Sequence, residues 1–301
     1  MGTYVTQIFN GISVSSIYLM AALGLAITFG LMKVINMAHG EFIMVGAYVT
    51  FLVQNIFLRF WSGAFSIYFL VAIPIAFVVA GLFGLALEIL VIRHLYGRPL
   101  DSLLATWGVS LVLQQLARNI FGAPNVDVRS PGWLNGSVTV FNGFVMPYKR
   151  LFILLLVVIC LAAVYLLLYH TSYGRRIRAV MQNRDMAASL GIPARKVDAY
   201  TFALGSGLAG IAGCALTLLG SIGPTLGTNY IVDTFMVVVL GGVGRLIGTV
   251  TGAGIIGVGG TAFEFLTNTS MAKVLIFAVV IAFLQWKPKG LFTINSRALD
   301  D

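Results

Sequence analysis

Long apolar runs, separated by short polar interruptions, fill almost the whole chain. Nine runs have the composition of helices: 8–31, 36–58, 65–92, 100–121, 151–170, 197–220, 230–242, 248–267 and 272–286. A helix needs about 20 apolar residues to cross a bilayer, so the short seventh and ninth runs indicate broken, tilted or re-entrant segments. The pattern predicts one all-α domain over residues 1–301, a polytopic transmembrane bundle of eight or nine spans.

The composition agrees with a membrane protein and excludes the main alternatives. Hydrophobic residues make up 59% of the chain and charged residues 10%, against about 25% charged in a soluble domain. Mean hydropathy is +0.96. The apolar runs are continuous and do not alternate, which excludes a transmembrane β-barrel. Cys160 and Cys214 lie inside apolar runs and show neither metal-ligand spacing nor a disulfide framework.

Basic residues predict the orientation of the chain in the membrane. The net charge is +9, and Lys and Arg concentrate in the cytoplasmic loops of membrane proteins, so the charge needs no nucleic-acid partner. Nine crossings from an outside N-terminus put thirteen of the 19 Lys and Arg residues inside. The six outside are Arg59, Arg118, Arg129, Lys149, Arg150 and Lys273. We therefore expect an outside N-terminus and a cytoplasmic C-terminus.

The longest polar interruption on the outer side spans 122–150. It contains three prolines and the turn pairs Asn135-Gly136 and Asn142-Gly143, with short β-branched stretches between them. Such a pattern predicts a small extracytoplasmic loop with a hairpin. The loop is either a connector or a docking surface.

The longest basic stretch, 171–196, lies on the predicted cytoplasmic side. A helical pattern opens there and ends at Gly191 and Pro193, which are typical C-terminal residues. A solvated loop, or a helix lying on anionic headgroups, is one interpretation. The other is a helix near 175–191 that docks on a partner protein, because its small residues leave room for a groove. The candidate docking residues are Arg175, Arg176, Arg178, Asp185, Ala187, Ala188 and Gly191.

Polar side chains gather at the head of the second span, where lipid would penalise them. Asn36, His39 and Glu41 lie within six residues. Polar residues in a span usually face the bundle interior or a water-filled path. Alternatively, Asn36 caps the helix and Glu41 interacts with its N-terminal dipole. One His and one Glu are too few ligands for a metal site. Further candidates for a translocation path are Thr106, Gln114, Gln115, Asn229 and Asp233.

A glycine-rich segment follows the short seventh run. Gly241, Gly242 and Gly244 interrupt the apolar pattern before Arg245. A short apolar segment with such a break is typical of a discontinuous transporter helix. It is not a phosphate-binding loop, because the Gly-Lys-Ser/Thr ending is missing.

These motifs together resemble the permease family of ATP-binding-cassette importers for branched-chain amino acids and urea. The first signature is Thr28-Phe29-Gly30 with Asn36-Met37-Ala38-His39-Gly40-Glu41. The second combines 173–176 with 187–192, and the third is 237–244. The resemblance covers nearly the whole chain. Within the family, 125–134 and 230–242 look most like the urea-transporter permease.

The resemblance implies a set of partners in a bacterial inner membrane. A second homologous permease subunit would pair with this one, two cytoplasmic ATPases would bind the pair, and an extracytoplasmic binding protein would deliver solute. The chain itself has no Walker motif, so we expect no cofactor here and ATP hydrolysis on the partners. The classical coupling motif places an acidic residue directly before two alanines. Here Asp185 stands two positions before Ala187, which leaves the register of the contact open.

The polar residues of the spans favour urea as the solute, with branched-chain amino acids as the alternative. Urea is neutral and needs donors and acceptors that hold it weakly enough to release it. A zwitterionic amino acid would need compensating charge and a wider apolar path. Two other classes are weaker. A proton-driven transporter would use His39, Glu41, Asp233 or Glu264 as a relay, and an intramembrane enzyme would need a catalytic pattern that the spans lack.

Overall fold

Each of the nine apolar runs forms a helix in the computed structural model, which describes residues 2–32, 34–139 and 145–292. These helices are α1 Gly2–Met32, α2 His39–Phe60, α3 Tyr68–Leu90, α4 Pro99–Phe121, α5 Tyr148–His170, α8 Ala194–Leu216, α9 Leu226–Gly241, α10 Leu246–Leu266 and α11 Thr269–Trp286. The links carry η1 Ser62–Ile67, η2 Ile92–His94, η3 Gly132–Leu134, β1 Ser137–Thr139, β2 Val145–Pro147, α6 Ser172–Gln182 and α7 Arg184–Ser189. The predicted polytopic helical fold is confirmed.

Seven of these helices are long and apolar enough to cross a membrane, among the described residues. The two others are α4 and α9, so the number falls short of the eight or nine spans expected. α9 has 16 residues, about 24 Å of helix, against a hydrocarbon core of about 30 Å. α4 has the length but carries charged and amide side chains that lower its hydropathy. Whether these two helices also cross stays a prediction.

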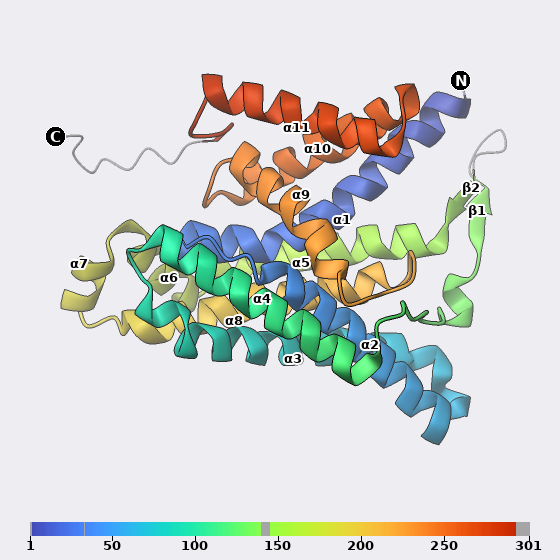
Figure 1. Ribbon diagram of the computed structural model, residues 1–301, viewed down its shortest axis with the longest axis horizontal. Coiled ribbons are helices and arrows are strands. Elements are labelled where there is room, and N and C mark those ends of the chain that lie inside the picture. The colour runs from blue at the N-terminus through green and yellow to red at the C-terminus, as the bar shows by residue number, and fades with distance from the viewer. Residues whose placement is uncertain (1, 33, 140–144, 293–301) are drawn as a thin grey trace.

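The long helices run between two ends of the molecule (Figure 1). One end carries α6 and α7, and the opposite end carries the β1–β2 hairpin. α1 starts at the hairpin end, and α11 ends at the α7 end. The 122–150 loop and the 171–196 segment therefore lie on opposite ends of the bundle. This arrangement agrees with the alternation from which the orientation was predicted.

α8 is the central helix of the bundle. In its apolar window 83% of the residues are buried, and it packs against α1, α2 and α3. Glycines permit this close packing: a Cβ at Gly213 would lie 1.9 Å from the Ile43 carbonyl oxygen, and one at Gly210 would lie 2.5 Å from that of Ala76. Small residues let helices approach closely in lipid, where association relies on van der Waals contact. A displacement of α8 therefore changes its packing contacts with all three neighbouring helices.

α9 and α10 pack side by side as a helical hairpin. A Cβ at Gly241 would lie 2.1 Å from the Gly248 carbonyl oxygen, and one at Gly252 would lie 2.4 Å from that of Val237. Gly242 and Gly244 between the helices have φ of 97° and 87°, which only glycine adopts readily. The glycine-rich segment is thus the turn between two helices and not an unwound stretch within one span. The prediction of an unwound span differs from the structure because the glycines allow α9 and α10 to pack closely against each other.

The loop between α4 and α5 forms a small antiparallel hairpin, in which Val138 pairs with Met146. The turn pair Asn142-Gly143 lies outside the described residues, as do Lys33 and Arg297. An isolated bridge joins Val126 to Ile222, with N–H to O distances of 2.8 and 2.9 Å. The bridge ties this loop to the segment that precedes α9.

Candidate functional site

The chain enters α2 through a buried polar turn. The Asn36 Oδ1 atom accepts a hydrogen bond from the Ala38 backbone N–H at 3.1 Å, and its Nδ2 atom is buried with no hydrogen-bond partner among the described residues. The N-cap position itself is Ala38, without a side-chain cap. Asn36 is 1% exposed, so it folds the turn from inside the bundle and does not cap α2 at an interface.

His39 and Glu41 point to different sides of α2. The His39 Nε2 atom lies 3.1 Å from the Ala21 carbonyl oxygen of α1. A Cβ at Gly24 would come within 3.0 Å of the imidazole and 2.1 Å of the Gly205 carbonyl oxygen, so the ring lies where α1 approaches α8. Two residues along a helix turn the side chain by about 200°. His39 therefore packs among helices, away from the side that carries Glu41.

Glu41 is the centre of a polar cluster shared by three helices. Its Oε1 atom accepts hydrogen bonds from Ser110 Oγ and Gln114 Nε2 of α4, both at 2.8 Å. Gln114 Nε2 also lies 3.1 Å from Thr228 Oγ1 of α9. Glu41 is 1% exposed, yet its Oε2 atom has no hydrogen-bond partner among the described residues. A buried carboxylate oxygen without a donor is costly, and this oxygen therefore distinguishes Glu41 from the other members of the cluster.

One face of α4 supplies most of this cluster. Ser102, Thr106, Ser110 and Gln114 are four residues apart and all buried, so they form a single polar stripe. Thr106 Oγ1 accepts a hydrogen bond from the Met37 N–H at 3.1 Å. The stripe thus lines both the turn before α2 and the Glu41 side chain.

Close contact between Gly40 and Gly227 brings α9 to the same place. A Cβ at Gly227 would lie 2.4 Å from the Gly40 carbonyl oxygen and 2.8 Å from the Glu41 nitrogen. Thr228, the next residue, is exposed. The cluster therefore reaches the surface of the chain through Thr228.

Three more of the predicted path residues, besides His39, lie outside this cluster. Gln115 is on the exposed face of α4, where its Nε2 atom hydrogen-bonds Asn119 Oδ1 at 3.2 Å. Asn229 is exposed. Asp233 lies further along α9, and its Oδ2 atom is 3.4 Å from Lys273 Nζ of α11. The carboxylate of Asp233 thus has its own counter-charge, unlike that of Glu41.

The 171–196 segment forms two helices, so the prediction of a single helix near 175–191 is wrong. Asn183 has an extended backbone, and its Oδ1 atom accepts a hydrogen bond from the Met186 N–H at 2.9 Å. Asn at an N-cap ends one helix and starts the next. α7 has six residues, and the exposed Gly191 follows it with φ of 82°.

Some of the expected docking residues of this segment are exposed, and others are half-buried or buried. Arg175, Arg176, Asp185 and Ala188 are exposed. Arg178 is half-buried, donates to the Leu168 carbonyl and lies 5.1 Å from the Tyr169 ring centroid. The buried side of α6, α7 and the start of α8 consists of Ile177, Val180, Ala187, Ala194 and Val197.

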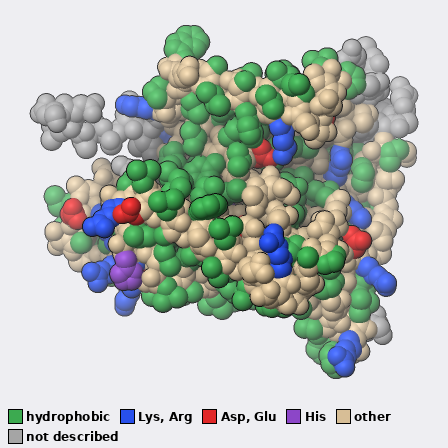
Figure 2. Space-filling view, in the orientation of Figure 1, with side chains coloured by type: hydrophobic (Ala, Val, Ile, Leu, Met, Phe, Trp, Pro, Cys, Tyr) green, Lys and Arg blue, Asp and Glu red, His purple; other side chains and the backbone are tan. Residues whose placement is uncertain are grey.

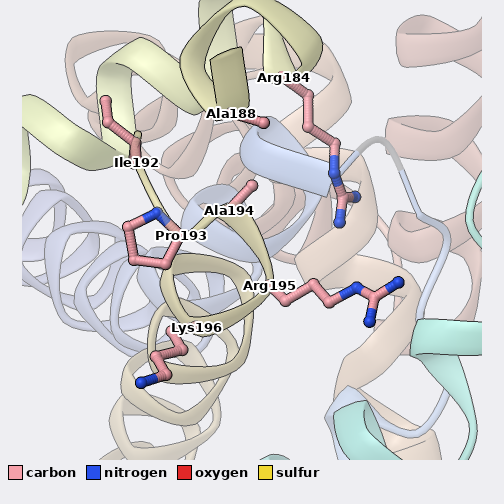
Figure 3. A pocket seen from close by; sticks show the side chains of 7 residues that line it. All are labelled: Arg184, Ala188, Ile192, Pro193, Ala194, Arg195 and Lys196. Carbon is pink, nitrogen blue, oxygen red and sulfur yellow. The ribbon is translucent and has the colours of Figure 1, made fainter. Parts of the chain in front are cut away.

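A basic groove lies between α7 and the start of α8, with a volume of about 530 Å³. Its lining consists of Arg184, Ala188, Ile192, Pro193, Ala194, Arg195 and Lys196. Arg184 and Arg195 extend on one side of it, while Ile192 and Pro193 lie on the other (Figure 3). Charged side chains gather at this end of the molecule, beside the largely hydrophobic face over α4 (Figure 2).

The chain belongs to the family described as "Branched-chain amino acid transport system / permease component", whose model matches residues 7–284. It is therefore a membrane-embedded permease, a transport component rather than an enzyme. The proton-driven transporter considered above gains no support from this membership.

Two relatives match nearly the whole chain. The "High-affinity branched-chain amino acid transport system permease protein BraD" of Pseudomonas aeruginosa is 27% identical over 294 residues, which cover 96% of this chain and 95% of the relative. The "High-affinity branched-chain amino acid transport system permease protein LivH" of Salmonella typhimurium is 29% identical over 295 residues, with the same coverage. The "Ribose import permease protein RbsC" of Escherichia coli is 36% identical over 131 residues, 41% of this chain and 40% of that relative. No solved structure matches.

Proposed function

We propose that this chain is a permease subunit of an ATP-driven importer for branched-chain amino acids. The observation that carries the proposal is the similarity over 96% of the chain to permeases that are named for this solute. The partners are a second homologous permease subunit, two ATPases and an extracytoplasmic solute-binding protein. The α7 end faces the cytoplasm, because the basic loops lie at that end.

Branched-chain amino acids replace urea as the preferred solute. The urea prediction rested on segments 125–134 and 230–242 and on the neutral polar residues of the spans, and the relatives described above give it no support. The Glu41 cluster also suits a zwitterion. A buried carboxylate with one oxygen free of donors is a natural partner for an ammonium group, whereas neutral urea supplies no charge to compensate Glu41.

The path for the solute passes along the polar stripe of α4. Glu41, Thr106 and Gln114 are the predicted residues that support this route, together with Asn36 in the adjoining turn. Ser110 and Thr228 join them through their hydrogen bonds. α4 makes few contacts within the chain, which leaves its other face for lipid or for the second permease subunit.

The ATPase docks on α6, α7 and the groove beside them. Met186 is 59% exposed and Leu190 is 76% exposed, on a segment outside the candidate spans. Exposed apolar side chains beyond the membrane are typical of a protein interface. Arg175 and Arg176 add positive charge to the same surface, so the partner surface is acidic at its rim.

Uptake by the reconstituted complex tests the substrate. The permease pair, the ATPases and the binding protein are placed in proteoliposomes, and labelled leucine, valine and urea are offered at low concentration. We expect ATP-dependent uptake of leucine and valine that urea does not compete for. Uptake of urea without uptake of either amino acid would overturn the proposed substrate.

A bulky residue on α7 tests the docking. We expect Ala188→Trp to lower leucine uptake and ATPase stimulation about tenfold, because a contact that requires a small residue is blocked by overpacking. Val145→Trp at the hairpin end is the control of equal bulk and should leave both rates unchanged. If Ala188→Trp matches this control, α7 does not dock on the ATPase.

A further inference from the structure

A buried network of charged side chains joins α7 to the bundle. Its five members are Glu88 near the end of α3, Arg93 in η2, Tyr96 in the following link, Arg184 at the start of α7 and Asp198 in α8. The ion pairs of this network do not include Glu41. The network therefore requires an explanation of its own.

The first half of the network joins the end of α3 to the link that follows it. Glu88 Oε2 lies 3.0 Å from Arg93 Nη2, and Glu88 Oε1 accepts a hydrogen bond from the Tyr96 hydroxyl at 3.2 Å. Glu88 has no exposed surface. Burial raises the pKa of Tyr96, and the nearby carboxylates of Asp198 and Glu88 raise it further, so the hydroxyl stays protonated and donates.

The second half of the network holds α7. Arg184 Nη2 lies 2.7 Å from Asp198 Oδ2, close enough for an ion pair although the atoms are not aligned as a hydrogen bond. The Arg184 guanidinium also lies 4.4 Å from the centroid of the Tyr96 ring, a cation–π contact. Tyr96 thus touches both ion pairs and joins α3 to α7 and α8.

Stability alone does not explain this arrangement. The carboxylates of both ion pairs are buried, while the Arg93 and Arg184 side chains are 32% and 37% exposed. The desolvation of a buried carboxylate offsets most of its attraction to a partner, and apolar residues of equal volume usually stabilise a fold as well or better. A helix of six residues does not form by itself, and the only buried residue of α7 is Ala187. Arg184 is therefore the principal side-chain anchor of α7.

Asp198 belongs to α8, which packs against α1, α2 and α3. It lies in the second turn of α8. A Cβ at Gly205, Gly210 or Gly213 of α8 would lie within 2.7 Å of a carbonyl oxygen of α1, α3 or α2, respectively, so α8 packs closely on all three helices. α2 carries Glu41. A rigid link between α7 and α8 therefore connects α7 to the proposed solute path through two contacts: that of α7 with α8 and that of α8 with α2.

We propose that Arg184 is a positioning residue of the transport cycle: its pairing with Asp198 makes α7 and α8 move as one body, so that a displacement of α7 reaches the helices around Glu41. The inference rests on the proposed function, in which an ATPase displaces α7. It adds to that function the particular contact that transmits the movement.

A double-mutant cycle in the reconstituted complex tests the inference. Arg184→Gln, Asp198→Asn and the double variant are compared by leucine uptake, by ATPase activity with the loaded binding protein, and by the number of leucines moved per ATP hydrolysed. Each single variant is expected to lower this ratio about tenfold, within the range of coupling between contacting charged residues. The double variant is expected to be no worse than either single variant, because both remove the same contact.

Two controls separate transmission from folding and from docking. Lys289→Gln removes an exposed positive charge after α11, outside the groove, without breaking an ion pair of the described residues, and it should keep the wild-type ratio. Arg184→Lys keeps the charge and should recover part of the ratio lost in Arg184→Gln. Co-purification with the ATPases should remain within twofold of wild type in all variants.

The possible results decide the inference. A wild-type ratio in Arg184→Gln and Asp198→Asn, single losses that multiply in the double variant, or an equal loss in Lys289→Gln would each overturn it. If Arg184→Gln does not assemble, the uptake ratio of Asp198→Asn alone decides. A wild-type complex that takes up no leucine would overturn the proposed function instead, and so the two failures are distinguishable.

Discussion

The Glu41 cluster and the network of Arg184, Asp198, Tyr96, Glu88 and Arg93 both contain buried carboxylates, but the partners of these carboxylates differ in charge. Glu88 and Asp198 each have an arginine within 3.0 Å. Glu41 has only neutral donors, and one of its oxygens has none among the described residues. A paired carboxylate fixes the parts it joins, whereas a carboxylate with unused acceptor capacity can take a passing group. The two clusters therefore differ in the partners of their carboxylates and not in burial, and this difference underlies the two roles proposed for them.

The largest expected effect comes from breaking an ion pair of the network. Arg93→Ala leaves the Glu88 carboxylate buried with Tyr96 as its remaining partner, and we expect a loss of about 3 kcal/mol in the free energy of unfolding. Arg98→Ala is the matched control. Arg98 lies 3.9 Å from Asp101, and both side chains are exposed, so its loss should cost less than about 1 kcal/mol. Thermal unfolding of the purified permease measures both, and equal costs would contradict the comparison.

A change at Glu41 should act on transport and spare stability. Glu41→Gln keeps the size of the side chain but removes its charge, so the ammonium of the solute loses its partner. We expect leucine uptake to fall about tenfold, as the loss of one charge-assisted hydrogen bond would give, while the unfolding temperature stays within a few degrees. Glu264→Gln is the control, because the Glu264 carboxylate is exposed and, among the described residues, accepts a hydrogen bond only from Thr269, at 2.6 Å. Uptake that survives Glu41→Gln would remove Glu41 from the path.

Two adjacent glutamines sharpen the same distinction. Gln114→Leu removes the donor that links Glu41 to Thr228, and uptake should fall roughly fivefold for the loss of one buried hydrogen bond. Gln115→Leu changes the next residue, which faces outward, and should leave uptake within twofold of wild type. The ratio of the two uptake rates is the measurement. A larger loss in Gln115→Leu would mean that the exposed face of α4, and not the buried stripe, lines the path.

The sequence predicted the helices well, because apolar runs of this length have few other structures in a membrane. It predicted Thr106 and Gln114 but missed Ser110, although the four-residue spacing of the stripe on α4 was readable. Thr228 could not be predicted from the sequence, because it lies near Glu41 only as a result of the close backbone approach of Gly40 and Gly227. Gln115 and His39 were included because polarity in a span does not say which way a side chain points.

The coupling segment shows a similar limit. Asn183 could have been recognised as an N-cap that divides the segment into α6 and α7, because Asn is a preferred N-cap residue. The pairing of Arg184 with Asp198 depends on the turn at 191–193, which folds α7 back toward α8. No local pattern gives the direction of that turn.

The smallest expected effect concerns Tyr96, which belongs to both halves of the network. Tyr96→Phe removes the hydrogen bond to Glu88 but keeps the ring beneath Arg184, so α7 retains its anchor and only the link to α3 weakens. We expect the number of leucines moved per ATP to fall about twofold, less than a full buried hydrogen bond is worth, because Glu88 keeps Arg93. Tyr96→Leu removes the ring as well and should lower the ratio further, since the cation–π contact is lost too. If Tyr96→Phe and Tyr96→Leu are equal, the ring does not position Arg184, and transmission runs through Asp198 alone.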